Sequence, residues 1–366
     1  MRVGLGVAPF VSVPPRGYGG TELFVAGLAE GLSKLGHDVL VYTNGESTVA
    51  VEKRWIYPHS KWPISNDAEA TLRELEHTTW AVHDTSQHCA VIHVNSLQGV
   101  ACSRFADVPF VHTIHHPQEP NLSDFYQRHP CIQYVTISDF QRKRESLPKI
   151  TTIHHGIDLS RYKLGQGKRE YLSFLGRIAP IKGPHLAVAV AKRAGIPLKI
   201  AGEVQPLFRD YFETQLKPHI DGKFIEYVGV ADLSAKNELL GDSLAMLFPI
   251  QWDEPFGLVL IESMACGAPV LALPGGSVSE IVQNGVSGYV CNSIKELAFR
   301  AANLGLFPAA IRHYVKERFS VDRMAAQYCH LYEELVTGTV AGLDSASAKP
   351  AGPNEIPASC NNRKAA

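Results

Sequence analysis

The order of apolar segments limits most narrowly how this chain can fold, because short β-branched runs alternate with longer helical patterns along most of its length. We expect strands at residues 2–7, 38–42, 91–95, 110–115 and 133–138, and a second series at 171–175, 198–201, 224–228, 245–249 and 270–273. Helices are expected at residues 21–35, 67–83, 138–146, 183–194, 207–219, 233–241 and 257–266. Such alternation predicts an α/β fold in which helices cover both faces of parallel sheets.

A polar, glycine-containing segment separates the two series. It begins with His154-His155-Gly156-Ile157-Asp158 and continues to residue 168, and this composition is typical of a linker. We therefore predict two doubly wound, Rossmann-like domains at residues 1–158 and 159–319, facing each other across a cleft. Ligands of such sheets bind at the carboxyl ends of the strands, so loops from both domains would meet in that cleft.

The C-terminal part of the chain divides at Gly338. Ser320 is suited to cap a helix, and the apolar pattern that follows predicts a helix over residues 320–337 that packs back toward the N-terminal domain. Residues 338–366 are rich in Ala, Ser, Pro, Gly and Asn and contain few large apolar side chains. This composition predicts a disordered tail.

Charge and cysteine usage exclude several classes of protein. The formal net charge is −1, so no overall field attracts the chain to nucleic acid or to an anionic membrane. The seven cysteines are scattered without a CxxC pair, which predicts a reduced cytoplasmic protein with neither a disulfide framework nor a structural zinc site. No apolar run is long enough to span a bilayer, and the first residues are expected to form a strand rather than a signal peptide.

Two glycine-containing turns precede predicted helices. Gly19 and Gly20 stand where backbone N–H groups and the helix dipole can hold an anion, although a simple turn capped by Thr21 explains the same residues. Arg177 and Lys182 flank the end of the strand at 171–175, where they could bind a diphosphate between them. The alternative is a pair of solvated surface cations.

Two glutamates, Glu254 and Glu262, bracket the start of a predicted helix over residues 256–266. A carboxylate can accept two hydroxyl hydrogen bonds at once, as the vicinal diol of a ribose or hexose requires. The first backbone amides of this helix, at Phe256, Gly257 and Leu258, are suited to bind phosphate. Alternatively, Glu254 only complements the helix dipole and Glu262 is exposed, but a predicted buried segment around Glu262 makes that reading weaker for both residues together.

Four motifs occur together and in order. They are Gly19-Gly20-Thr21-Glu22, Gly176-Arg177 with Lys182-Gly183, Glu254-Pro255-Phe256-Gly257 with Glu262, and Pro274-Gly275-Gly276 with Glu280. With this set the chain resembles the retaining glycosyltransferases of family 4 over roughly residues 1–337. The resemblance implies the GT-B fold and transfer of a hexose-type sugar, with retention, from a nucleotide-diphosphate donor to an acceptor hydroxyl. It also implies that neither a metal nor another cofactor is needed.

The resemblance assigns roles to residues of the C-terminal domain, which would bind the nucleotide sugar. Glu262 matches the glutamate that binds the ribose hydroxyls, and Glu254 matches the one that approaches the donor sugar. Arg177 and Lys182 match the pair that holds the diphosphate.

The N-terminal domain would bind the acceptor and complete the donor site. Gly19 and Gly20 match the loop that closes on the leaving phosphate. His115 best matches a histidine that contacts the donor sugar near the reacting carbon. The catalytic set implied by the resemblance is Glu254, His115, Arg177 and Lys182.

Other histidines receive no role. His112, His115 and His116 lie close together in sequence, but no carboxylate is spaced to complete a metal site, so none is predicted. The family more often has an asparagine before Gly156, which leaves His154 and His155 as residues of the linker without an assigned chemistry.

Two alternatives to sugar transfer remain open at the level of sequence. They are a GT-B nucleotide-sugar epimerase and a non-catalytic protein that binds a sugar nucleotide. The sequence also leaves open the donor base and sugar, the acceptor (a small molecule, a glycan or a lipid-linked sugar) and the oligomeric state.

Overall fold

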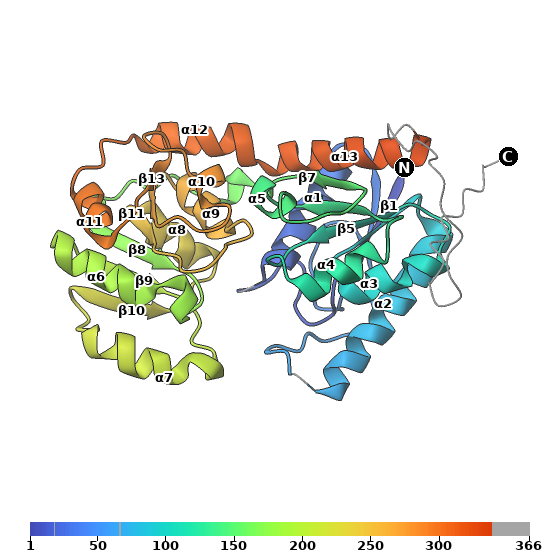
Figure 1. The fold of residues 1–366 in the computed structure, drawn as a ribbon, viewed down its shortest axis with the longest axis horizontal. Helices are drawn as coiled ribbons and strands as arrows, with labels where there is room; N and C mark the ends of the chain where they lie inside the picture. Colours follow the sequence, from blue (N-terminus) through green and yellow to red (C-terminus); the bar gives the residue numbers. More distant parts are fainter. Residues whose placement is uncertain (18, 66, 339–366) are drawn as a thin grey trace.

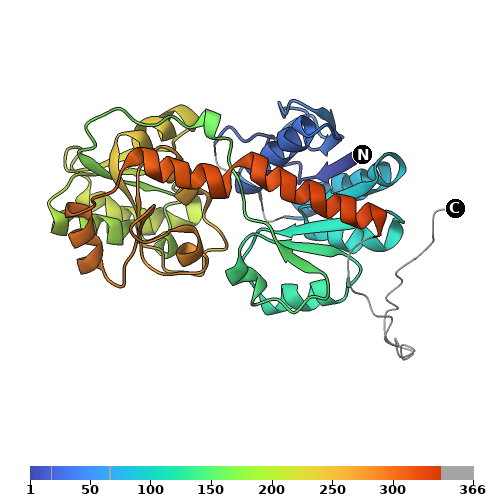
Figure 2. The same ribbon diagram turned by 90° about the horizontal axis from the view of Figure 1, so that it is seen from above.

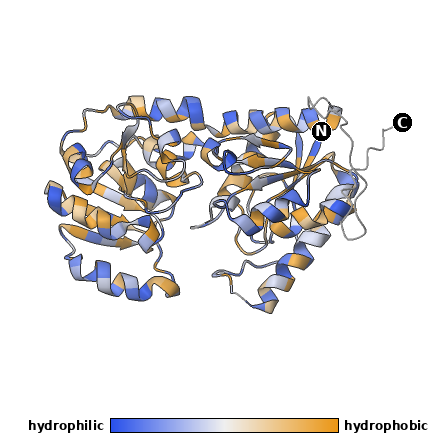
Figure 3. Cartoon of the chain, viewed as in Figure 1, coloured by the Kyte–Doolittle hydropathy of each residue, from blue (hydrophilic) through white to orange (hydrophobic). Residues whose placement is uncertain are grey.

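The computed structural model describes residues 1–17, 19–65 and 67–338, which form two parallel β-sheets flanked by helices (Figure 1). The predicted disordered tail, residues 338–366, lies outside the described residues except for Gly338. Apolar residues concentrate in the strands of both sheets, whereas polar and apolar residues alternate along most helices (Figure 3). The predicted α/β class with two doubly wound sheets is confirmed.

The N-terminal sheet has seven parallel strands in the order β3-β2-β1-β4-β5-β6-β7. The strands are β1 (Arg2–Gly6), β2 (Asp38–Tyr42), β3 (Glu52–Arg54), β4 (Val91–Val94), β5 (Phe110–Ile114), β6 (Gln133–Thr136) and β7 (Ile150–Thr152). Its longer helices are α1 (Gly20–Lys34), α2 (Ala68–His88), α3 (Leu97–Cys102) and α4 (Pro120–Gln127), followed by the short α5 (Asp139–Arg142).

The C-terminal sheet has six parallel strands in the order β10-β9-β8-β11-β12-β13. The strands are β8 (Tyr171–Leu175), β9 (Leu198–Ala201), β10 (Ile225–Gly229), β11 (Ser243–Phe248), β12 (Val270–Ala272) and β13 (Gly288–Val290). The helices are α6 (Pro184–Ala194), α7 (Arg209–Tyr211), α8 (Leu233–Gly241), α9 (Leu258–Ala265), α10 (Val278–Ile281), α11 (Ile294–Ala302) and α12 (Pro308–Phe319).

The prediction of a single helix over residues 207–219 is wrong. The structure instead has a 3-10 turn (Pro206–Phe208), α7, a π-helical turn (Phe212–Leu216) and a second 3-10 turn (Lys217–His219). Pro218 cannot donate a backbone hydrogen bond and clashes with a regular helix before it, which accounts for the irregular end.

The last helix, α13 (Val321–Thr337), returns to the N-terminal domain after α12 has packed on the C-terminal domain (Figure 2). It lies against α1 and contributes Met324, Tyr328 and Tyr332 to the buried core of the N-terminal domain. The Tyr332 hydroxyl lies 2.6 Å from Nδ1 of His93, a buried residue of β4, so the contact is polar as well as apolar.

The chain crosses between the domains at two adjacent places. The Ile157 amide donates to the carbonyl of Phe319 (2.9 Å), and the Val321 amide donates to the carbonyl of Ile157 (3.0 Å). Gly156 permits this close approach, because a Cβ atom there would lie 2.3 Å from the backbone oxygen of Ser320. The two crossings therefore form one paired connection.

Two further findings concern the cysteines and membranes. Cys131 is disulfide-bonded, which corrects the expectation of a fully reduced set, since spacing along the chain does not reveal pairing across it. The free cysteines among the described residues are Cys89, Cys102, Cys266, Cys291 and Cys329. In the described parts of the chain, no helix has both the length and the apolar character that crossing a membrane would require.

Candidate active site

A cleft of about 470 Å³ lies between the two domains. It is lined by loops that follow strands β1, β5, β8 and β11, as expected for the carboxyl ends of parallel strands. The structure brings all ten site residues named from the sequence to this cleft: Gly19, Gly20, His115, Arg177, Lys182, Glu254, Phe256, Gly257, Leu258 and Glu262.

Glu254 lies in the loop between β11 and α9 and is only 7% exposed. Its Oε2 atom pairs with Nζ of Lys182 at 2.5 Å and accepts a hydrogen bond from Nε1 of Trp252 at 2.9 Å. The Lys182 ammonium group also lies 4.6 Å from the centre of the Trp252 ring, a cation–π distance. Glu254, Lys182 and Trp252 thus form one connected group, and the sequence did not indicate Trp252.

Helix α9 begins at Leu258, one to two residues later than the sequence predicted. Gly257 has φ of 85°, in the left-handed region that favours glycine, so the helix cannot extend back through it. The first amides of a helix have no acceptor inside it, and this end of α9 faces the cleft. Across the cleft, a Cβ atom on Gly20 would touch the Leu258 side chain at 3.6 Å, so the Gly19–Gly20 turn lies directly opposite.

Glu262 lies inside α9 and is 1% exposed, so the alternative of a solvent-exposed glutamate is wrong. The Tyr162 hydroxyl donates to its Oε1 at 2.8 Å, and Nζ of Lys236 lies 3.0 and 3.3 Å from its two oxygens. Burial, and then the neighbouring Glu262 carboxylate, raise the pKa of Tyr162 above its ordinary value, which keeps its proton in place. Tyr162 and Lys236 also line the cleft, and the sequence indicated neither.

Arg177 follows β8 and is partly buried at the cleft. Its Nε atom is buried without a hydrogen-bond partner among the described residues. The guanidinium group lies 5.9 Å from the Phe208 ring. Because Lys182 is paired with Glu254 at the same edge of the sheet, neither cation is an isolated, solvated surface group, and a guanidinium with unused donors is suited to an anion.

His115 and His155 stack at the domain boundary with ring centres 5.4 Å apart. Nε2 of His115 donates to Oδ1 of Asn95 at 2.8 Å, which leaves its Nδ1 as an acceptor. Burial, followed by the neighbouring His155, places the pKa of His115 well below its ordinary value of 6.5. Burial and then His154 lower the pKa of His155 to about 3. Both rings are therefore neutral at pH 7, and His155, which the sequence left without a role, lines the cleft.

Glu280 joins the two domains beside this site. Its carboxylate accepts hydrogen bonds from the amides of Asp139 (2.9 Å) and Phe140 (3.1 Å) at the start of α5, and contacts Nε2 of His154. Burial raises the pKa of Glu280, but the bonds from His154 and the two amides outweigh it and hold the pKa below 4.5. The fourth motif found in the sequence therefore has a structural contact that crosses between domains.

Glu22 lies in the first turn of α1 and also lines the cleft. Burial raises its pKa from 4.5 to about 7, although a bond to its own backbone amide acts in the opposite direction. The sequence motif contained this residue, but only the fold shows that its carboxyl group is partly removed from water.

Comparisons with known proteins agree with this arrangement. The model of Glycosyltransferase Family 4 matches residues 18–161, and that of Glycosyl transferases group 1 matches residues 157–302. Glycogen synthase of Mycobacterium tuberculosis is 27% identical over 338 residues, which cover 76% of this chain and 80% of that protein.

Solved structures share the fold. AviGT4, a glycosyltransferase involved in avilamycin A biosynthesis, superposes with a TM-score of 0.71 at 24% identity, covering 92% of this chain and 98% of that one. HepE of Anabaena, solved in complex with UDP and glucose, has a TM-score of 0.71 at 17% identity and covers 92% of this chain and 100% of that one. The protein described here thus belongs to family 4 of the glycosyltransferases and has the GT-B fold.

Proposed function

We propose that this glycosyltransferase moves a hexose-type sugar from a nucleotide-diphosphate donor to an acceptor hydroxyl, with retention at the anomeric carbon and without a metal ion. The observation that carries the proposal is the placement of two carboxylates, Glu254 and Glu262, in one cleft beside Arg177 and the start of α9. The presence of UDP and glucose in the related HepE structure supports the class of donor.

The donor would extend along α9. Its ribose hydroxyls would bind Glu262, which Tyr162 and Lys236 hold in a fixed position. The diphosphate would lie between Arg177 and the first amides of α9, where the helix dipole also favours negative charge. It would compete with Glu254 for the ammonium group of Lys182. The freed oxygens of Glu254 could then accept hydrogen bonds from the sugar.

The reaction would break the bond between the anomeric carbon and the phosphate oxygen while the acceptor oxygen forms a bond on the same face. The acceptor proton would pass to the departing phosphate. Negative charge grows on the diphosphate as its bond breaks, so Arg177, Lys182 and the α9 amides would bind the transition state more strongly than the ground state. His115, neutral and with an accepting Nδ1, would bind a sugar hydroxyl without adding charge.

Calorimetry with UDP, GDP and dTDP tests the binding site first. We expect Arg177→Ala to lower the affinity for the tightest-binding of these nucleotides by roughly 10- to 100-fold, because a hydrogen bond to a charged group contributes about 1.5–3 kcal/mol. Arg193→Ala, on the exposed side of α6 in the same domain, is the matched control and should bind as the wild type does. Equal affinities for Arg177→Ala and wild type would refute the proposed diphosphate site.

Product analysis separates transfer from the two alternatives. An acceptor-dependent release of nucleotide, with a new α-glycoside formed from an α-linked donor, is expected for retaining transfer. Conversion of the sugar nucleotide without an acceptor would instead indicate an epimerase. We expect Glu254→Gln to lower turnover without weakening nucleotide binding, since Glu254 would contact the sugar and Glu262 the ribose, and loss of the Glu254 charge frees Lys182 for the diphosphate. Unchanged turnover would contradict this assignment.

A further inference from the structure

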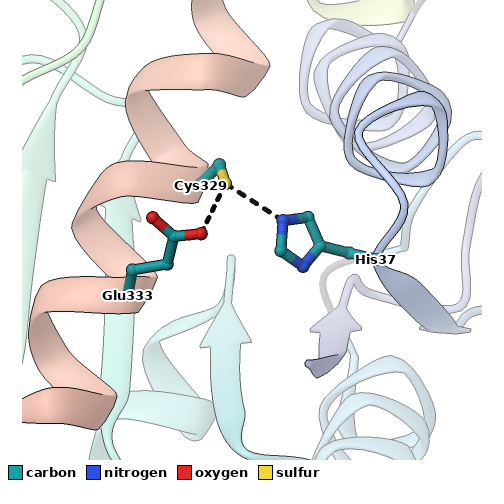
Figure 4. A group of neighbouring side chains, drawn as sticks. All are labelled: His37, Cys329 and Glu333. Carbon is teal, nitrogen blue, oxygen red and sulfur yellow. Dashed lines mark hydrogen bonds between the residues drawn. The ribbon is translucent and has the colours of Figure 1, made fainter.

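A histidine, a cysteine and a glutamate converge on the N-terminal domain away from the cleft (Figure 4). His37 lies in the turn between α1 and β2, and Cys329 and Glu333 lie one turn apart on α13. The cleft is formed by loops after the strands, whereas His37 precedes β2, so this cluster lies at the opposite edge of the sheet. It plays no part in the proposed transfer reaction.

The distances within the cluster are close to those around a tetrahedral metal ion. Nε2 of His37 lies 3.0 Å from Sγ of Cys329, and Sγ lies 3.4 Å from Oε1 of Glu333. All three atoms lie within 4.8 Å of one another. With zinc bonds of about 2.3 Å to sulfur and about 2.0–2.2 Å to nitrogen and oxygen, neighbouring ligand atoms in a tetrahedral site lie about 3.5 Å apart. Small side-chain shifts would therefore admit an ion.

We propose that His37, Cys329 and Glu333 bind a zinc ion whose fourth position is open to water. A thiolate, an imidazole and one carboxylate are ligands that suit zinc, whereas magnesium and calcium prefer sites made of oxygen atoms. Glu333 is exposed and the other two side chains are partly exposed, so an ion can enter from solvent. On binding, the thiol proton leaves to solvent and the imidazole coordinates through an unprotonated Nε2.

The site would fasten α13 to the turn that follows α1. These two helices already pack together, and α13 is the last connection between the domains. Because the ligands come from segments nearly 300 residues apart (292 between His37 and Cys329), they are assembled only in the folded protein. Zinc would therefore bind the native state and stabilise it.

The same contacts also fit a simple hydrogen-bonded chain, in which the imidazole N–H donates to sulfur and the thiol donates to Glu333. Titration of the reduced full-length chain with zinc and with cobalt distinguishes the two. We expect wild type to bind one more equivalent of zinc than Cys329→Ser, and to show a thiolate-to-cobalt charge-transfer band that Cys329→Ser lacks. At zinc concentrations near one hundred times Kd, the Tm of wild type should rise by about 5 °C.

His330→Ala is the matched control. His330 is next to Cys329 on α13, but its side chain is 74% exposed and pairs with Glu334 instead. We expect this variant to keep both the extra equivalent of zinc and the cobalt band. Glu333→Gln should keep the fold and lower the affinity for zinc at least tenfold. This second variant keeps the proposal testable even if Cys329→Ser does not fold. Equal zinc stoichiometry in wild type and Cys329→Ser, or a wild type without the cobalt band, would overturn the proposal.

Discussion

Glu22 should make the stability of the N-terminal domain depend on pH between about 4.5 and 7. Burial raises the pKa of its carboxyl group to about 7, from an ordinary value of 4.5. The start of α1 favours the ionised form by only about 0.3–1 kcal/mol, so burial dominates. Because the folded protein holds this proton more tightly than the unfolded chain, the stabilising contribution is present below pH 4.5 and lost as pH rises toward 7.

The size of the effect follows from the two pKa values. At 1.36 kcal/mol per pH unit, the difference between 4.5 and about 7 corresponds to about 3.4 kcal/mol. The side chain is partly exposed, and solvent screening reduces this figure, so we expect about 1–2 kcal/mol in practice.

Urea unfolding of wild type and Glu22→Gln from pH 4.5 to pH 8 measures this contribution, since glutamine keeps the shape but cannot ionise. We expect the variant to exceed the wild type by about 1–2 kcal/mol at pH 8 and the difference to vanish near pH 4.5. Subtracting one protein from the other cancels the titration of other groups. A difference that is constant across this range, or that grows toward low pH, would refute the reasoning.

Two further predictions concern carboxylates that are paired with basic side chains. Lys236→Met leaves Glu262 with Tyr162 alone as a partner, so we expect urea unfolding to show a free energy of unfolding lower by about 3–5 kcal/mol. The double variant Lys236→Met/Glu262→Met should recover most of this loss. A single variant as stable as the wild type would contradict the ion pair. Glu280→Ala removes the contacts to His154 and α5, so small-angle scattering should give a larger radius of gyration than for wild type; an unchanged radius would mean that other contacts hold the domains.

Central strands were predictable from sequence, whereas three of the four strands at the sheet edges were not. All ten expected strands are present with small shifts of their ends. Nine of them are central strands, which appear as continuous apolar runs because they are buried on both faces, and the tenth is the edge strand β10. The three missed strands, β3, β7 and β13, each have three residues and all lie at an edge. Edge strands are short and partly solvated, so their sequences carry a weak pattern.

Some residues of the candidate site were likewise predictable from sequence and others were not. Motifs identified the residues that line the cleft, since a turn, a strand end or a helix start is a local feature. The motifs could not identify the hydrogen-bond and ion-pair partners of those residues. Lys236 precedes Glu262 by 26 positions and Tyr162 precedes it by 100, and each is a single polar residue within ordinary sequence. Only the packing of α8 and the linker against α9 brings them together.

The charges in the cleft connect Glu22 with the proposed donor. Among the described residues, five cationic side chains line the cleft, and two of them, Lys182 and Lys236, are already paired with Glu254 and Glu262. The other three are arginines, which leaves an excess of positive charge for the proposed diphosphate. Ionised Glu22 opposes that excess within a partly dehydrated space, whereas protonated Glu22 does not. A nearby diphosphate would raise the pKa of Glu22 further, so binding of the proposed donor would itself favour the neutral carboxyl group.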